Sequence, residues 1–119
     1  MPTLTKQDIV AKFRSDLKTK QIDVPALGGS ITIRELSGTE RDHLDTLRIM
    51  EKDKEKVLHE NYIYAAACGI VNESGEQLFS YDEIKAQYKA NSLAIRFIAD
   101  NVQELSDATG GEGATVTKN

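Results

Sequence analysis

The sequence has 119 residues, enough for one domain built around a single hydrophobic core. Its hydrophobic fraction of 39% and charged fraction of 29% are typical of a globular chain, and no apolar run reaches the ~18 residues of a membrane-spanning helix. The net charge of −4 argues against binding of nucleic acid through its phosphates. Residues 1–9 are polar, so we expect no secretory signal, and the single cysteine fits a reducing cytoplasm.

The first predicted element is an amphipathic helix. Thr5 is placed to cap a helix that starts near Lys6, and Lys18 and Lys20 are suited to its C-terminal end, where cations oppose the helix dipole. The apolar residues that share one face at helical spacing are Ile9, Val10, Phe13 and Leu17. This face is expected to pack on the rest of the domain.

The pattern then changes to strand-like alternation over residues 20–36. The pairs that share a face are Ile22 with Val24 and Ile31 with Ile33. Between them, the segment 25–30 contains a proline and two glycines, which indicate a turn. We therefore expect one β-hairpin, which must pack on helices or pair with another strand because a lone hairpin is marginal in water.

Capping-box patterns at Ser37 and at Ser80 predict the starts of two further helices. Between them, residues 54–71 are predicted to form the central helix, whose second half is apolar nearly all round and therefore buried. The single cysteine, Cys68, lies in that apolar half, so we expect a buried and inert thiol. A turn is predicted over residues 72–76, followed by Leu78 and Phe79 as anchors on the core.

Ser92 is placed to cap the last helix. Its predicted core stripe consists of Ala94, Ile95, Ile98, Val102 and Leu105. In all, the sequence predicts a mainly α fold with one β-hairpin, in the α+β class, with four to five helices around a buried central helix. The domain is expected to span residues 1–106, and the glycine-rich segment 107–119 is expected to be a flexible, disordered tail.

The motifs of catalysis and metal binding do not match this sequence. His43 and His59 fall on different predicted helices, and no Gly-x-Ser-x-Gly pattern is present. One cysteine and two distant histidines give no zinc spacing, and residues 72–76 lack the ligand pattern of a calcium loop. We predict no catalytic, cofactor-binding or metal-binding residue and no enzyme, with a small enzyme that has a dispersed site kept as an alternative.

Two surfaces remain as candidates for binding other proteins. The first is the hairpin, whose edge could receive another strand. The second is the pair Leu93 and Phe97, which lies outside the core stripe of the last helix. Either surface could instead be covered by the rest of the domain.

Several segments, read in order, resemble the tail assembly chaperones of long-tailed bacteriophages. These segments are residues 4–9, the block 24–36 with its Val-Pro, Gly-Gly turn and Ile-Thr-Ile-Arg-Glu-Leu strand, its continuation over 37–42, and the acidic turn 71–80 that ends in Leu-Phe-Ser. Many relatives carry a tryptophan in the turn after Pro25, where this chain has Ala26 and Leu27. The likeness covers about residues 4–105.

The resemblance implies a phage or prophage protein that binds the tape measure protein and helps recruit tail tube subunits during tail assembly. It implies action in the cytoplasm of the bacterial host, absence from the mature virion, and self-association around a rod-like client. The expected partner-binding residues are Leu93, Phe97, Ala26 and Leu27, with no cofactor, nucleic acid or membrane involved. The alternative within the same class is a structural head–tail joining or minor tail protein.

Overall fold

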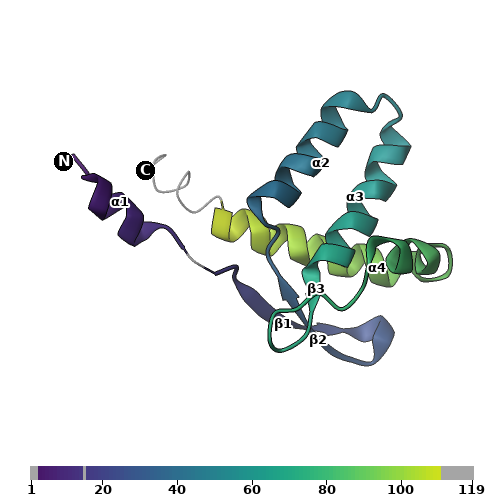
Figure 1. The fold of residues 1–119 in the computed structure, drawn as a ribbon. Helices are drawn as coiled ribbons and strands as arrows, with labels where there is room; N and C mark the ends of the chain where they lie inside the picture. The colour runs from purple at the N-terminus through teal and green to yellow at the C-terminus, as the bar shows by residue number, and fades with distance from the viewer. Residues whose placement is uncertain (1–2, 15, 111–119) are drawn as a thin grey trace.

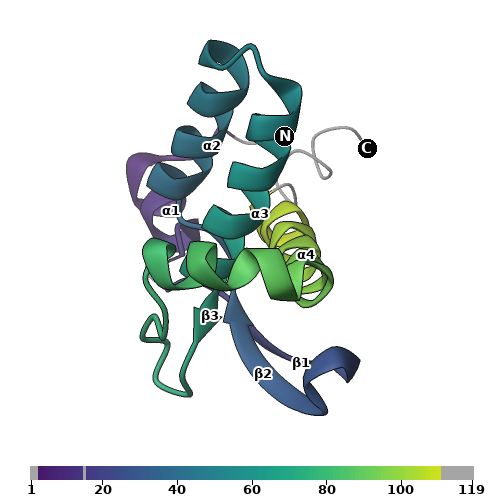
Figure 2. The same cartoon turned by 90° about the vertical axis from the view of Figure 1, so that its right-hand side faces the viewer.

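The computed structural model describes residues 3–14 and 16–110. The elements in chain order are α1 (Lys6–Lys12), β1 (Thr19–Val24), the 3-10 turn η1 (Pro25–Leu27), β2 (Gly29–Arg34), α2 (Gly38–Met50), α3 (Lys54–Gly69), β3 (Ile70–Val71) and α4 (Tyr81–Gly110). Helices α2 and α3 form an antiparallel pair that stands on α4, and the hairpin of β1 and β2 lies on the opposite side of α4 (Figures 1 and 2). The predicted mainly α fold with a β-hairpin is confirmed.

The sheet has one strand more than the predicted hairpin. Its order is β1-β2-β3 with antiparallel neighbours, and Ile33 of β2 pairs with both Lys20 of β1 and Ile70 of β3. The alternation of β1 and β2 is as predicted, since Ile22 faces Ile31 across the ladder. The apolar run 62–71 had suggested helix to its end, but its last two residues leave the helix to pair with β2.

The core lies where α4 crosses α3 and one face of the sheet. The apolar second half of α3 is buried as predicted, and so is most of the predicted stripe of α4. Gly69 allows this close approach, because a Cβ atom there would lie 2.3 Å from Cγ2 of Val102. Leu78 and Phe79 were expected to anchor the loop on the core, and this is wrong, since they are 52% and 40% exposed.

The helices predicted from Ser80 and from Ser92 are joined in α4, which is kinked at Asn91 (φ −126°, ψ 29°). The predicted capping box at Ser80 is present, because Ser80 and Glu83 exchange hydrogen bonds of 2.9 and 3.1 Å. The helix continues through Gly110, past the expected start of the tail, and residues 111–119 of that tail lie outside the described residues. No helix in the described ranges is long and apolar enough to span a membrane.

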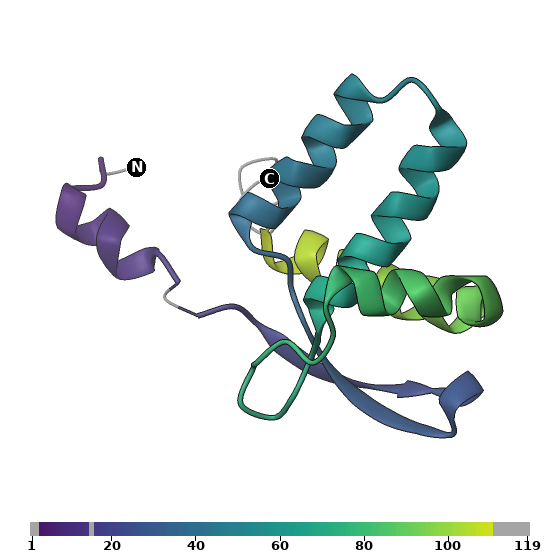
Figure 3. The ribbon, with the colours of Figure 1, turned by 45° about the vertical axis from the view of Figure 1, so that its right-hand side comes forward.

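Helix α1 differs most from its prediction. Its capping box at Thr5 is present, but the helix ends at Lys12, and none of its residues is buried. Figures 1 and 3 show α1 standing apart from the rest of the fold. Phe13 is already extended (φ −70°, ψ 134°), and just before β1 the Lys18 carbonyl accepts a hydrogen bond of 2.9 Å from the Glu35 amide.

Candidate interaction surface

The tip of the hairpin presents two apolar side chains. Pro25 starts the 3-10 turn, and Gly28 closes it in the left-handed conformation (φ 70°), which glycine adopts without strain. The Gly28 amide donates to the Val24 carbonyl at 3.1 Å. This geometry leaves Ala26 and Leu27 at the outermost point of the turn, with Leu27 57% exposed.

The segment of α4 after the kink at Asn91 presents two more exposed apolar side chains. Asn91 leaves the helical conformation, and its Nδ2 donates to the Gln87 carbonyl at 3.1 Å. Leu93 and Phe97 then lie one helical turn apart on the outer side of α4, because the core stripe occupies the opposite side. Leu93 is 79% exposed and Phe97 42% exposed.

The hairpin tip and the kinked part of α4 meet in space. A hollow of about 240 Å³ lies between them. Its lining residues are Ala26, Leu27, Ala90, Asn91, Ser92, Leu93 and Ala94. Three of the four predicted partner-binding residues therefore line one hollow, and Phe97 continues the same apolar strip one turn along α4. We call Ala26, Leu27, Leu93 and Phe97 the candidate surface.

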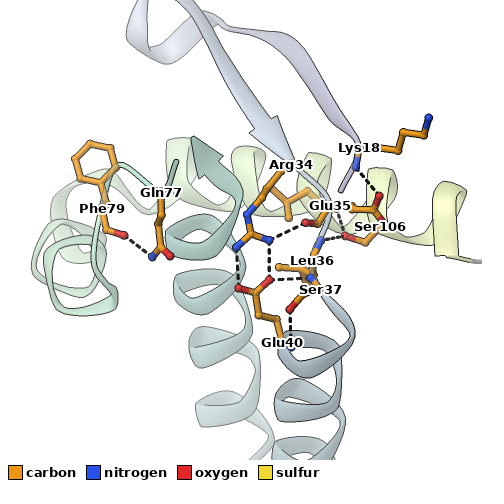
Figure 4. A network of polar contacts seen from close by, with 10 residues as sticks. Lys18, Arg34, Glu35, Leu36, Ser37, Glu40, Gln77, Phe79 and Ser106 are labelled. Atoms are coloured by element: carbon orange, nitrogen blue, oxygen red, sulfur yellow. Dashed lines mark hydrogen bonds and ion pairs between the residues drawn. The ribbon is translucent and has the colours of Figure 1, made fainter. Parts of the chain in front are cut away.

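A polar network fixes the junction of β2 and α2, and of its contacts the sequence predicted only the Ser37 capping box (Figure 4). Arg34 donates two hydrogen bonds of 2.8 Å to the carboxylate of Glu40, which also accepts from the Ser37 amide at 2.8 Å. Burial alone would raise the pKa of Glu40, but these hydrogen bonds outweigh it and lower the pKa to about 2. Burial, with the nearby Glu40, raises the pKa of the Cys68 thiol to about 12.

A second part of the network attaches the N-terminal segment to the core. Glu35 is almost fully buried, and its carboxylate pairs with the Arg14 guanidinium and accepts from the Lys18 amide at 2.7 Å. Beside it, the Leu36 amide donates at 2.8 Å to Oγ of Ser106 in α4. The sequence carried a signal for this site, because Glu35 continues the alternation of the buried face of β2 and so places a carboxylate toward the core.

A charged groove of about 610 Å³ lies between α3 and the first half of α4. Three lysines and three carboxylates line it, so it holds charges of both signs: Lys56, Lys85 and Lys89 with Asp53, Glu55 and Glu60. His59 contacts the ring of Tyr88 there, while His43 of α2 stacks on Tyr64 at 4.4 Å. Among the described residues, no group of three or more His, Cys, Asp or Glu side chains could hold a metal ion.

The fold belongs to a small mainly α class, in which two antiparallel helices and a three-stranded sheet are arranged around one long kinked helix. The structure of the bacteriophage HK97 tail assembly chaperone is similar, with a TM-score of 0.59 and 14% sequence identity over 75% of this chain and 85% of that chain. No protein-family model and no curated protein matches the sequence. The resemblance indicated by the sequence is thus confirmed in the fold.

Proposed function

We propose that this chain is a tail assembly chaperone of a bacteriophage or prophage. It binds the tape measure protein, helps recruit tail tube subunits, acts in the cytoplasm of the bacterial host, and is absent from the finished virion. The observation that carries the proposal is the shared fold with the HK97 chaperone over most of both chains. The sequence segments that resemble this family support it independently.

The distribution of apolar side chains suits this role. A chaperone holds its client through exposed apolar surface with a polar rim and releases it again. The candidate surface offers such an area, since Leu27 and Leu93 are more than half exposed and lie at one hollow. Burying an exposed leucine contributes about 2 kcal/mol to binding. Several such modest contacts would stabilise the complex with the client and still leave it reversible.

Co-expression with the tape measure protein encoded nearby tests the proposal. We expect the client to become soluble and to co-purify with this chain. Leu93→Asp and Phe97→Asp should weaken co-purification at least tenfold while the variants keep the helical circular dichroism of the parent. Ile49→Asp is the matched control, because Ile49 is 81% exposed, like Leu93, but lies on α2 away from the candidate surface.

The possible outcomes separate the parts of the proposal. A client that stays insoluble and does not co-purify would refute the chaperone function. Equal losses for Leu93→Asp and Ile49→Asp would refute the assignment to the candidate surface. Unfolding of Phe97→Asp would show that Phe97 belongs to the core. Mass spectrometry of purified virions tests the proposed absence from the finished particle, because a structural joining protein would remain in it.

A further inference from the structure

The N-terminal arm, residues 3–14, has an apolar face without a partner in the described structure. All of its residues are exposed, and Val10 and Phe13 reach 58% and 73%. Ile9 and Phe13 lie one helical turn apart, and Lys6 precedes them on the same side of α1. The arm therefore presents a short stripe that begins with a cation and continues with apolar side chains.

The exposed side of α4 carries the complementary stripe. Leu93 and Phe97 are followed on the same side by Asp100 and Glu104, at the spacing of successive helical turns. Both acidic side chains are exposed. In this stripe the apolar residues come first and the anions follow, which is the reverse of the order in the arm.

The two stripes match when the helices run antiparallel. Lys6 and Phe13 are about 10 Å apart along the arm, and so are Asp100 and Leu93 along α4. An antiparallel contact places Phe13 on Leu93, Ile9 and Val10 on Phe97, and Lys6 on Asp100. A parallel contact would bury Lys6 against Leu93 and leave both charges unpaired, which is unfavourable.

We propose that the arm of one copy docks antiparallel on the Leu93–Glu104 stripe of a second copy. The arm cannot occupy the stripe of its own chain. Arg14 is held on Glu35, next to the Leu36–Ser106 hydrogen bond, and Ser106 lies about 20 Å along α4 from Leu93. Phe13 is only about 4 Å along the backbone from Arg14, so it stays far from its own Leu93.

Sedimentation velocity and light scattering on the purified chain alone test the contact. The parent should self-associate, and both Phe13→Asp and Leu93→Asp should be monomers with unchanged circular dichroism. Phe13→Asp keeps an intact stripe, whereas Leu93→Asp keeps an intact arm. An equimolar mixture of the two variants should therefore form a one-to-one heterodimer, joined by the single intact pair of surfaces.

Charge reversal tests the predicted orientation. Lys6→Glu should weaken self-association about tenfold, and adding Asp100→Lys should restore it. Ile49→Asp is the control for general loss of apolar surface and should associate like the parent. A monomeric parent at the highest attainable concentration, or a mixture of the two monomeric variants that forms no heterodimer, would overturn the proposal. Because no client is present, either result is independent of tape measure binding.

Discussion

Gly69, the last residue of α3, lies directly against Val102 of α4, and its substitution by alanine tests how tightly the two helices must pack. A Cβ atom at Gly69 would lie 2.3 Å from Cγ2 and 2.8 Å from Cγ1 of Val102. Carbon atoms pack at about 3.5–4.0 Å, so one helix must move by about 1 Å. Val102 is fully buried, and its branched side chain has little rotamer freedom in a helix, so it cannot turn away.

We expect Gly69→Ala to lower the free energy of unfolding by about 2–3 kcal/mol, the cost of overpacking a core site. The gain in helix propensity is small, because Gly69 is the final residue of its helix. Urea unfolding followed by circular dichroism measures the loss, and the midpoint should fall by about 1–2 M. Gly38→Ala is the control, since nothing lies within 4 Å of a Cβ atom there, and its effect should stay below about 0.5 kcal/mol.

A double variant separates the steric clash from other causes. Val102→Ala alone should cost about 2 kcal/mol through the cavity it creates. In the double variant the methyl group of Gly69→Ala occupies part of that cavity. The double variant should therefore lose at least about 1 kcal/mol less in free energy of unfolding than the sum of the two single losses. Strict additivity, or a Gly69→Ala variant as stable as the parent, would refute the reasoning.

Three further predictions concern polar groups that are buried or half-buried. Folding lowers the pKa of Glu40 from 4.5 to about 2, so ionised Glu40 contributes up to about 3 kcal/mol to the free energy of unfolding above pH 4.5, and this contribution disappears as the pH falls toward 2. In urea unfolding at several pH values, Glu40→Gln should therefore lose much of the acid dependence of stability. An unchanged dependence would contradict the prediction. Cys68, buried and with a pKa raised to about 12, should react with a disulfide reagent at pH 8 only as fast as the protein opens, so immediate labelling of the native protein would contradict its inertness. Ser106→Ala leaves the buried Leu36 amide without its acceptor and should cost about 1–3 kcal/mol in urea unfolding, whereas a neutral effect would show that another group replaces the hydroxyl.

Local chemistry made much of the fold predictable. The capping boxes at Thr5, Ser37 and Ser80 each involve residues three apart in the chain, so the sequence contains both partners. The hairpin was equally local, since Pro25 and Gly28 fix its turn and alternation fixes its faces. Strand β3 was missed because Ile70 and Val71 suit a buried helix as well as a buried strand. Only their pairing with the edge of β2 makes them extend.

The amphipathic periodicity of the N-terminal segment was read on the assumption that an apolar face is buried in its own chain. The structure violates that assumption, because α1 buries none of its residues. The same limit applied to the candidate surface. Leu93 and Leu27 were each predicted to bind partners, but only the packing of α4 against the hairpin brings them to one hollow.

The candidate surface links the two proposals, because Leu93 and Phe97 are the proposed contacts of both the client and the arm of a second copy. The stripe cannot hold the arm and a client segment at once, so the two proposed contacts should compete. On these proposals, free chains would cover each other's apolar stripe, which would lower the risk of non-specific aggregation. A client with many binding segments would then release the arms and collect many chains, whose weak contacts would add through avidity. Adding soluble tape measure segments should therefore dissociate the self-associated parent, while Leu93→Asp, which is expected to be a monomer from the start, should not respond.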